Sequence, residues 1–371
     1  MFSLFTTRHL HFVFTLCKVI TQAVLNALLG RFWSLGHMFD NPGLEESHTS
    51  GGMRGLTNYH LSCCVNTLLQ TLSATWEILD LLEKWEAARG RRDSRNVPQE
   101  LKRVLSAMRG DLPQPAPHRD FLHCLDRNCI RLGMQHDADE VFLSILNLMQ
   151  QQMDDRALAL EIQNLYKISV ETHLQCLECS SIQTRSSYML SLPLHIKEDT
   201  NSLESCMTSF FEHQELRGIN RCFCAQCGMK RTSKQGVKLL SLPRILCVHL
   251  KRFRNMHSST LKLDCRVTFP ETFDFLEILQ DAFSTGFEQK DTKYTLYAVI
   301  VHSGYAACGH YTAYVRHRVN KHWYYADDSH VQQTSWEEVK TTYGGHCRET
   351  AYMLMYRRDF KEEGRQPEFS G

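Results

Sequence analysis

Two pairs of cysteines constrain the fold of this chain more than any other feature of its sequence. Cys176 and Cys179 form the first pair, in CLEC, and Cys224 and Cys227 form the second, in CAQC. Two such pairs supply four thiolates, the donor set of a closed, tetrahedral Zn²⁺ site. We therefore expect the two pairs to meet around zinc rather than remain free thiols, although nearby Cys222 is a competing ligand. Because the protein would fill all four positions, the ion is expected to be structural.

Composition indicates a globular protein of a reducing compartment. The 371 residues include 15 cysteines, an odd number scattered along the chain, which is unlike a small disulfide-bonded secreted domain. Hydrophobic residues make up 43% of the chain, enough for a sizeable core. The net charge of +1 gives no reason to expect nucleic acid or an anionic membrane as a partner.

Residues 1–54 are expected to form a leader and a linker. The segment 1–39 lacks aspartate and glutamate and mixes apolar with basic residues, and 41–55 is rich in glycine and serine. The longest uncharged stretch, Val19 to Gly30, is too short to span a bilayer, so no transmembrane segment is expected. A targeting presequence or interfacial helix fits the leader, but we favour a docking helix or a loosely ordered segment.

Apolar periodicity changes from helical in the first half of the chain to strand-like in the second. One helix is expected from Cys63 to about Leu82, with Ser62 as its cap, and others around 98–108 and from Asp137. Short β-type runs follow at 238–242, 245–250, 294–302, 311–316, 323–325 and 351–356. This order predicts an α+β fold in which a helical lobe faces a sheet lobe across a cleft.

A cysteine and a distant histidine give the clearest indication of chemistry. Cys63 lies at the expected start of a helix, where the positive end of the helix dipole favours a thiolate. Asn58 is placed to donate to an oxyanion, and Gly309 is expected to let the loop of His310 approach the thiol. A strand, a turn and a second strand would bring Asp327 beside His310. From Cys63 alone, a buried thiol with a structural histidine is the more frequent case.

Two carboxylates in the segment QHDADE offer a second candidate site. Asp137 and Glu140 lie one helical turn apart, so both could point into a cleft and bind a cationic segment. From their spacing alone, helix capping and solvent exposure are the simpler explanation. His249, in LPRILCVHLKRF, is expected to be packed in a core strand and not catalytic.

In this order, these motifs resemble those of the ubiquitin-specific proteases, papain-like enzymes that remove ubiquitin and related modifiers. The similarity includes the segments around Cys63 and His310, the CxxC pairs, LPRILCVHLKRF and HWYYADDS. It implies a catalytic domain at 55–358 with thumb, palm and zinc-ribbon fingers, the fingers at about 168–240, and a tail at 359–371.

The resemblance also implies a role for each candidate residue. The catalytic roles are nucleophile for Cys63, general base for His310, ring-orienting acid for Asp327, oxyanion donor for Asn58 and assisting carboxylate for Asp328. Asp137 and Glu140 become contacts for the arginine-bearing tail of the modifier, in place of the capping explanation. Structural Zn²⁺ is implied, and no organic cofactor.

Within the family, the compact size, the Cys63–Cys64 doublet, CFCAQCGMK and SWEEVKTTYG indicate the branch that acts on the interferon-stimulated, two-domain ubiquitin-like modifier. The implied substrate is an isopeptide between the modifier's C-terminal glycine and a target lysine, with ubiquitin as the alternative modifier. Interferon-receptor signalling proteins are implied partners, and the implied role is to restrain the interferon response. We expect the protein in the cytoplasm, with the nucleus as a second location to test.

The loop before Cys63 departs from the family pattern. His60 stands where the family usually has glycine, and Leu61 and Ser62 replace asparagine and threonine. If this position requires a positive φ, histidine costs on the order of 1 kcal/mol. Because the triad residue types are intact, we expect an active enzyme. The alternative is a slow or inactive adaptor that still binds the modifier.

Overall fold

The computed structural model describes residues 49–50, 53–85, 95–109, 117–256, 259–345 and 348–359. The expected leader, most of the linker and nearly all of the tail lie outside these residues. Among the helices in the described ranges, none is both long enough and apolar enough to cross a membrane.

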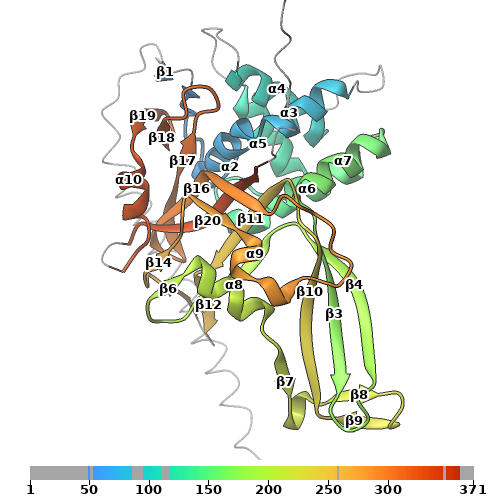
Figure 1. Ribbon diagram of the computed structural model, residues 1–371. Helices are drawn as coiled ribbons and strands as arrows, with labels where there is room; N and C mark the ends of the chain where they lie inside the picture. The colour runs from blue at the N-terminus through green and yellow to red at the C-terminus, as the bar shows by residue number, and fades with distance from the viewer. Residues whose placement is uncertain are drawn as a thin grey trace, which may run out of the picture. The chain divides into compact units, whose positions relative to one another are not determined.

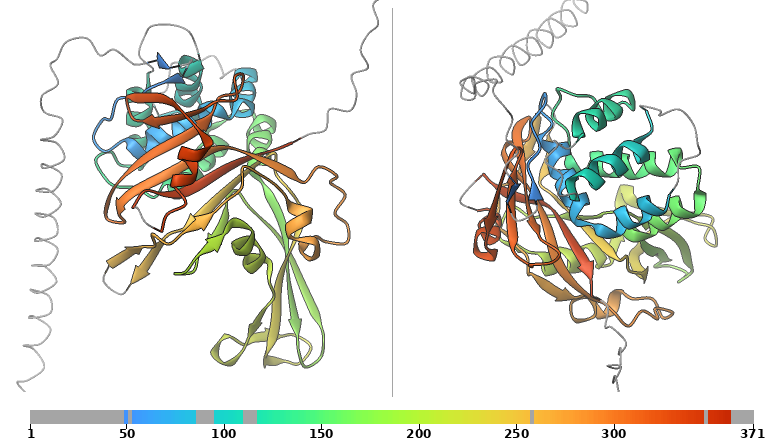
Figure 2. Two further views of the ribbon diagram at one scale, coloured as in Figure 1. Left: turned by 60° about the vertical axis from the view of Figure 1, so that its left-hand side comes forward. Right: turned by 90° about the horizontal axis from the view of Figure 1, so that it is seen from above.

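A helical lobe forms the first part of the described domain (Figure 1). Its helices are α2 (Cys63–Ala74), α3 (Trp76–Lys84), α4 (Val97–Arg109), α5 (His118–Arg127), α6 (Ala138–Gln152) and α7 (Arg156–Tyr166). Helix α2 is buried from Cys63 to Leu72 because it lies between the other helices and the large sheet, as the view from above in Figure 2 shows. This position explains why an amphipathic pattern is weak along α2.

The single helix expected from Cys63 to about Leu82 is wrong, because the chain breaks at Thr75. Thr75 has a ψ of 75°, outside the helical range, and its hydroxyl lies 2.9 Å from the Thr71 carbonyl oxygen and 2.7 Å from the Tyr297 hydroxyl. Helices α2 and α3 both bury apolar residues in the same core. Apolar spacing therefore continues across the break, and periodicity alone does not reveal it.

An eight-stranded sheet forms the second lobe. Its order is β19-β18-β17-β16-β20-β11-β5, with β15 paired to β16; β5 and β11 run parallel and the other pairs antiparallel. The strands are β5 (Leu192–His195), β11 (Ile245–Lys251), β15 (Thr272–Asp274), β16 (Lys293–Tyr305), β17 (Cys308–Arg316), β18 (Trp323–Asp327), β19 (His330–Thr334) and β20 (Thr350–Arg358). Every strand expected in this lobe is confirmed. Strand β20 is apolar on both faces because helices cover one side and a second core covers the other.

A narrower four-stranded sheet projects from the lobes, and we call it the finger sheet (Figure 1). Its order is β4-β3-β10-β7, formed by β4 (Ile182–Met189), β3 (Ile168–Cys176), β10 (Ser233–Ser241) and β7 (Gln214–Leu216). The hairpin of β8 (Cys222–Cys224) and β9 (Met229–Arg231) lies at its far end. Nearly all of β4 is exposed, so the outer part of this sheet lacks a hydrophobic core of its own.

Shorter elements complete the described fold. They are β1 (Thr49–Ser50), β2 (Met53–Arg54), β6 (Asn201–Ser202), α8 (Leu203–Phe211), η1 (Gly218–Asn220), β12 (Phe253–Met256), β13 (Ser259–Lys262), β14 (Val267–Thr268), α9 (Phe275–Ile278), η2 (Gln280–Ala282) and α10 (Trp336–Thr341). The α+β prediction, with helices first and a mainly antiparallel sheet later, is confirmed.

Candidate active site

Cys63 is the first residue of α2 and is only 2% exposed. Helix α2 packs against β16 and β17, so its N-terminal end lies at the edge of the sheet that carries His310. The Cys63 thiol lies close enough to the His310 ring to raise the pKa of that ring. Residues separated by most of the catalytic region therefore meet at the N-terminus of a buried helix, where the helix dipole stabilises negative charge.

Asp327 orients the ring of His310 from the neighbouring strand. The register of β17 and β18 pairs Ala313 with Ala326, which returns Asp327 to the start of β17. The Asp327 Oδ1 atom lies 2.7 Å from Nε2 of His310, which leaves Nδ1 for the thiol. Burial opposes the imidazolium charge, but hydrogen bonds to Asp327 and Cys63 outweigh it and raise the pKa of His310 to about 10.

Asp328 joins the loop of Asn58 to the hairpin that carries Asp327. The Nδ2 atom of Asn58 donates to Oδ2 of Asp328 at 2.8 Å, and its Oδ1 accepts from the Ser62 backbone N–H at 3.0 Å. Burial raises the pKa of Asp328, although hydrogen bonds from Asn66 and Asn58 oppose that rise. An amide nitrogen carries two N–H groups, so Asn58 has a second N–H beside the one that binds Asp328.

Asn66 is a residue of this site that we did not predict. Its buried Nδ2 atom donates to Oδ1 of Asp328 at 2.8 Å and lies 3.3 Å from the carbonyl oxygens of Leu56 and Thr57. One amide thereby ties α2, the Asn58 loop and Asp328 together. The signal in the sequence was a polar residue on the buried side of an apolar helix, one turn after Cys63.

Gly55 allows the Asn58 loop to lie against the β18–β19 turn. A Cβ atom on Gly55 would come within 2.0 Å of the Ser329 carbonyl oxygen. The next residue, Leu56, donates its backbone N–H to the Asp328 carbonyl at 2.7 Å. The chain therefore approaches Cys63 in direct backbone contact with the turn that holds Asp328.

The loop between Asn58 and Cys63 has an uncommon backbone conformation. His60 and Leu61 have φ values of 52° and 65°, so the family's glycine position does require a positive φ here. Each costs roughly 1–2 kcal/mol relative to an ordinary conformation. Ser62 is the N-cap residue of α2, as expected, but its side chain makes no capping hydrogen bond to the helix. Its hydroxyl instead accepts from the Tyr59 N–H at 2.9 Å and lies 3.4 Å from Asn58 Oδ1.

Gly309 is required for a reason other than the one we expected. A Cβ atom there would lie 2.2 Å from Nε2 of His302, a ring buried directly beneath the start of β17. Burial, with help from the charge of Lys262, lowers the pKa of His302 to about 3, so this ring is neutral. The Gly309 carbonyl accepts from Nε2 of Gln135 at 3.1 Å, which ties the His310 loop to the helical lobe.

Asp137 and Glu140 have different surroundings. Asp137 caps α6, because its Oδ1 accepts from the N–H groups of Asp139 at 2.9 Å and Glu140 at 3.3 Å. Its Oδ2 accepts a hydrogen bond from the Tyr352 hydroxyl, whereas the Glu140 residue is exposed. Behind them, Nδ1 of buried His249 lies 3.0 Å from Asp139 Oδ2, so His249 is packed in the core as expected.

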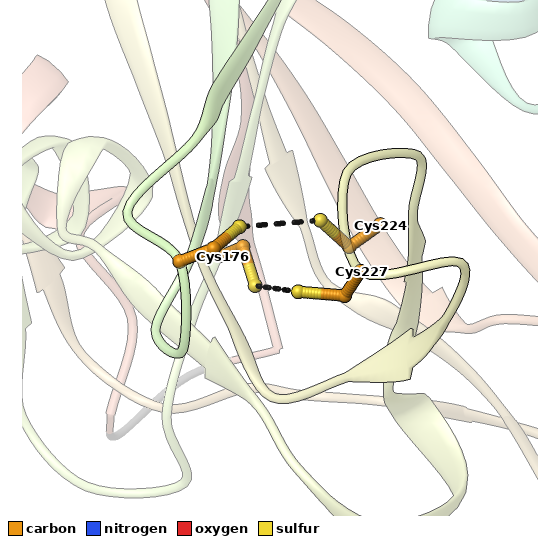
Figure 3. Close-up of side chains that lie close together, drawn as sticks. Cys176, Cys224 and Cys227 are labelled. Carbon is orange, nitrogen blue, oxygen red and sulfur yellow. Dashed lines mark hydrogen bonds between the residues drawn. The ribbon is translucent and has the colours of Figure 1, made fainter.

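The four predicted zinc ligands meet at the end of the finger sheet. Their sulfur atoms all lie within 4.8 Å of one another, with Cys176 and Cys227 at 4.0 Å and Cys179 and Cys224 at 3.5 Å (Figure 3). A tetrahedral ion with Zn–S bonds of about 2.3 Å needs sulfurs about 3.8 Å apart, so this donor set fits Zn²⁺. Cys222 is not in the group; its sulfur lies 3.8 Å from the Asn220 carbonyl oxygen.

Comparisons with known proteins agree with this arrangement. The human protein "Ubl carboxyl-terminal hydrolase 18" is 35% identical over 315 residues, which cover 82% of this chain and 85% of that protein. Its mouse counterpart is 36% identical over 315 residues, with the same coverage of 82% and 85%. "Ubiquitin carboxyl-terminal hydrolase 47" of Xenopus tropicalis is 27% identical over 381 residues, covering 84% of this chain and 28% of that protein.

A sequence profile of the family described as "Ubiquitin carboxyl-terminal hydrolase" matches residues 54–356. This match spans the helical lobe, the finger sheet and the large sheet, and it includes Cys63, His310 and Asp327. The chain therefore belongs to the ubiquitin carboxyl-terminal hydrolase family.

Proposed function

We propose that the protein is a thiol-dependent isopeptidase that removes a ubiquitin-like modifier from lysine side chains. The observation that carries this proposal is the position of Cys63 at the start of α2, close to His310, whose ring lies 2.7 Å from the Asp327 carboxylate. A thiol, a base and a group that orients the base are the parts required for acyl transfer through a thioester. Membership of a hydrolase family supports the same reaction class.

The reaction has two stages. His310 takes the thiol proton, and the Cys63 sulfur attacks the carbonyl carbon of the modifier's C-terminal glycine. The isopeptide C–N bond then breaks, His310 returns the proton to the lysine amine, and a thioester remains on Cys63. Water, activated by His310, hydrolyses the thioester and restores the thiol. The raised pKa of His310 supports this scheme, because it makes the ring a stronger acceptor for the thiol proton.

Asn58 and Asp328 are proposed to support the oxyanion. The free N–H of Asn58 and backbone N–H groups at the start of α2 would donate to the developing negative charge. Asp328 would act indirectly, since it fixes the Asn58 amide through the 2.8 Å hydrogen bond. This arrangement makes Asp328 a positioning residue and Asn58 a direct donor.

We propose the interferon-stimulated, two-domain ubiquitin-like modifier as the substrate, which would place the protein in the control of the interferon response. Support comes from the sequence resemblance and from the printed name of two relatives, which act on a Ubl carboxyl terminus. Exposed Glu140 would bind the arginine-bearing tail, while Asp137 would shape the same helix end. Ubiquitin is the second candidate, because the Xenopus relative is named for it.

We propose that Cys176, Cys179, Cys224 and Cys227 hold one structural Zn²⁺ ion. Four sulfurs within 4.8 Å of one another support this assignment. The ion would join the β3–β4 turn to the β8–β9 hairpin, where the finger sheet has little apolar core. It would take no part in the reaction, since all its positions would be filled.

Two electrophilic probes test the proposed reaction. One carries its electrophile at the C-terminus of the interferon-stimulated modifier, and the other carries it at the C-terminus of ubiquitin. We expect the first probe to label the wild-type protein at Cys63 and the Cys63→Ala variant to remain unlabelled and inactive while still binding the modifier. Labelling by both probes would indicate a broader deubiquitinase. Labelling by neither, in folded protein, would refute the enzyme and support a modifier-binding adaptor with a disabled His60 loop.

A further inference from the structure

Two exposed apolar side chains lie at the edge of the candidate active site. Leu61, which is 48% exposed, is two residues before Cys63, and Met134 is 56% exposed. Two hydrogen bonds flank Met134: the Gly133 N–H donates to the His60 carbonyl at 2.9 Å, and Gln135 Nε2 donates to the Gly309 carbonyl at 3.1 Å. Met134 is therefore held between the loop that leads to Cys63 and the loop that leads to His310.

The stability of the free protein does not explain a leucine at position 61. Its φ of 65° is unfavourable for leucine and is tolerated better by asparagine or glycine. Half of the residue faces solvent, so its burial in a core does not compensate for the strained backbone. Strain of this kind beside a reactive group is a reason to look for a ligand that the residue contacts.

The substrate supplies an apolar group at this place. In an isopeptide, the scissile nitrogen is attached to the four methylene groups of a lysine side chain. Those methylenes must lie close to the Cys63 sulfur while the bond is cut, so an apolar surface beside Cys63 would be in reach of them. We propose that Leu61 and Met134 form a subsite that binds this aliphatic stem, an inference that rests on the proposed isopeptidase function.

Matched acceptors test the subsite. Two peptides would carry the modifier on a single lysine or on 4-oxalysine, in which an ether oxygen replaces one methylene of the stem. We expect wild-type kcat/KM to favour lysine by about fourfold beyond any intrinsic difference, from the transfer of one methylene group. In Leu61→Asn and Met134→Gln that extra preference should disappear, and Leu61→Met should keep it.

Two controls make the result decisive. Val319, 81% exposed in the β17–β18 connection, is changed to asparagine as an apolar-to-polar substitution away from the site, and it should leave the preference intact. A modifier with a C-terminal propargylamide, which has no lysine stem, should label Cys63 in wild type and in Leu61→Asn alike. If wild type is unlabelled, the proposed function is wrong. If labelling is normal and both polar variants keep the lysine preference, the subsite is wrong.

Discussion

At the scale of single residues, the loop before Cys63 contains two consecutive non-glycine residues with positive φ. His60 and Leu61 are held there by the Gly133 N–H, which binds the His60 carbonyl, and by Asn58, which binds the Ser62 N–H. Contacts around the loop thus impose a conformation that the residues themselves disfavour. A substitution that removes this conformational strain should therefore increase the free energy of unfolding.

His60→Gly should stabilise the protein by about 1 kcal/mol, because glycine adopts a positive φ without steric cost. Urea unfolding at fixed pH measures the change. His123→Gly is the matched control: His123 is an exposed residue inside α5, so glycine there should destabilise by about 1 kcal/mol. Equal effects of the two substitutions would contradict the assignment of strain to His60.

His310 should make stability depend on pH in a defined direction. Its pKa in the folded state is raised to about 10, above the value near 6.5 expected in the unfolded chain, so folding favours the protonated ring. The resulting stabilisation is complete below about pH 6.5 and is lost as the pH rises toward 10. Unfolding free energies of wild type and His310→Gln should therefore converge between these limits. A constant difference would show that the ring is not held as an imidazolium.

At the scale of elements, the start of β17 depends on a close approach that leaves no room for a side chain. Gly309→Ala would place a methyl group 2.2 Å from the His302 ring, so the loop must move. We expect activity to fall at least about 100-fold, since displacements near 1 Å have this effect on catalysis. Gly286→Ala is the control, because nothing lies within 4 Å of its added Cβ. Normal activity of Gly309→Ala would show that the His310 loop tolerates displacement.

The finger sheet should depend on the proposed zinc ion. Cys227→Ser is expected to lower the zinc content from about one ion per chain and to reduce the yield of folded protein, because metal binding contributes folding free energy. Cys222→Ser is the control, since that thiol lies outside the cluster. Metal analysis of the two purified variants measures the number of zinc ions bound per chain. Full stability without metal in Cys227→Ser would exclude a structural zinc.

The sequence predicted long-range neighbours better than local detail. The meeting of His310 and Asp327 followed from strand lengths and a short turn, which fix the register. The break at Thr75 was missed because both helices bury apolar residues in one core. Asn66 was missed because its partners are backbone carbonyls and Asp328, and contacts of that kind leave no periodic pattern in a sequence.

At the scale of the whole domain, two hydrophobic cores share the same strands. Alternate residues of β16 enter different cores: Ile300 packs with the helical lobe, and Val299 and Val301 pack on the opposite side with α8 and α9. Because the same strands contribute side chains to both cores, the helical lobe and the sheet lobe are expected to unfold together. The finger sheet extends from this unit, and its outer strand β4 is almost entirely exposed.

The contact of Gly55 with Ser329 also has a mechanical consequence. The chain enters the catalytic region through Gly55 and Leu56, which are pressed against the turn of Asp328 and Ser329. A pulling force on the preceding chain would load this turn first, before it reached the buried part of α2. Asp328 lies in that turn and is hydrogen-bonded to Asn58, so tension on the N-terminal side would displace the Asn58 amide before it unfolded any helix.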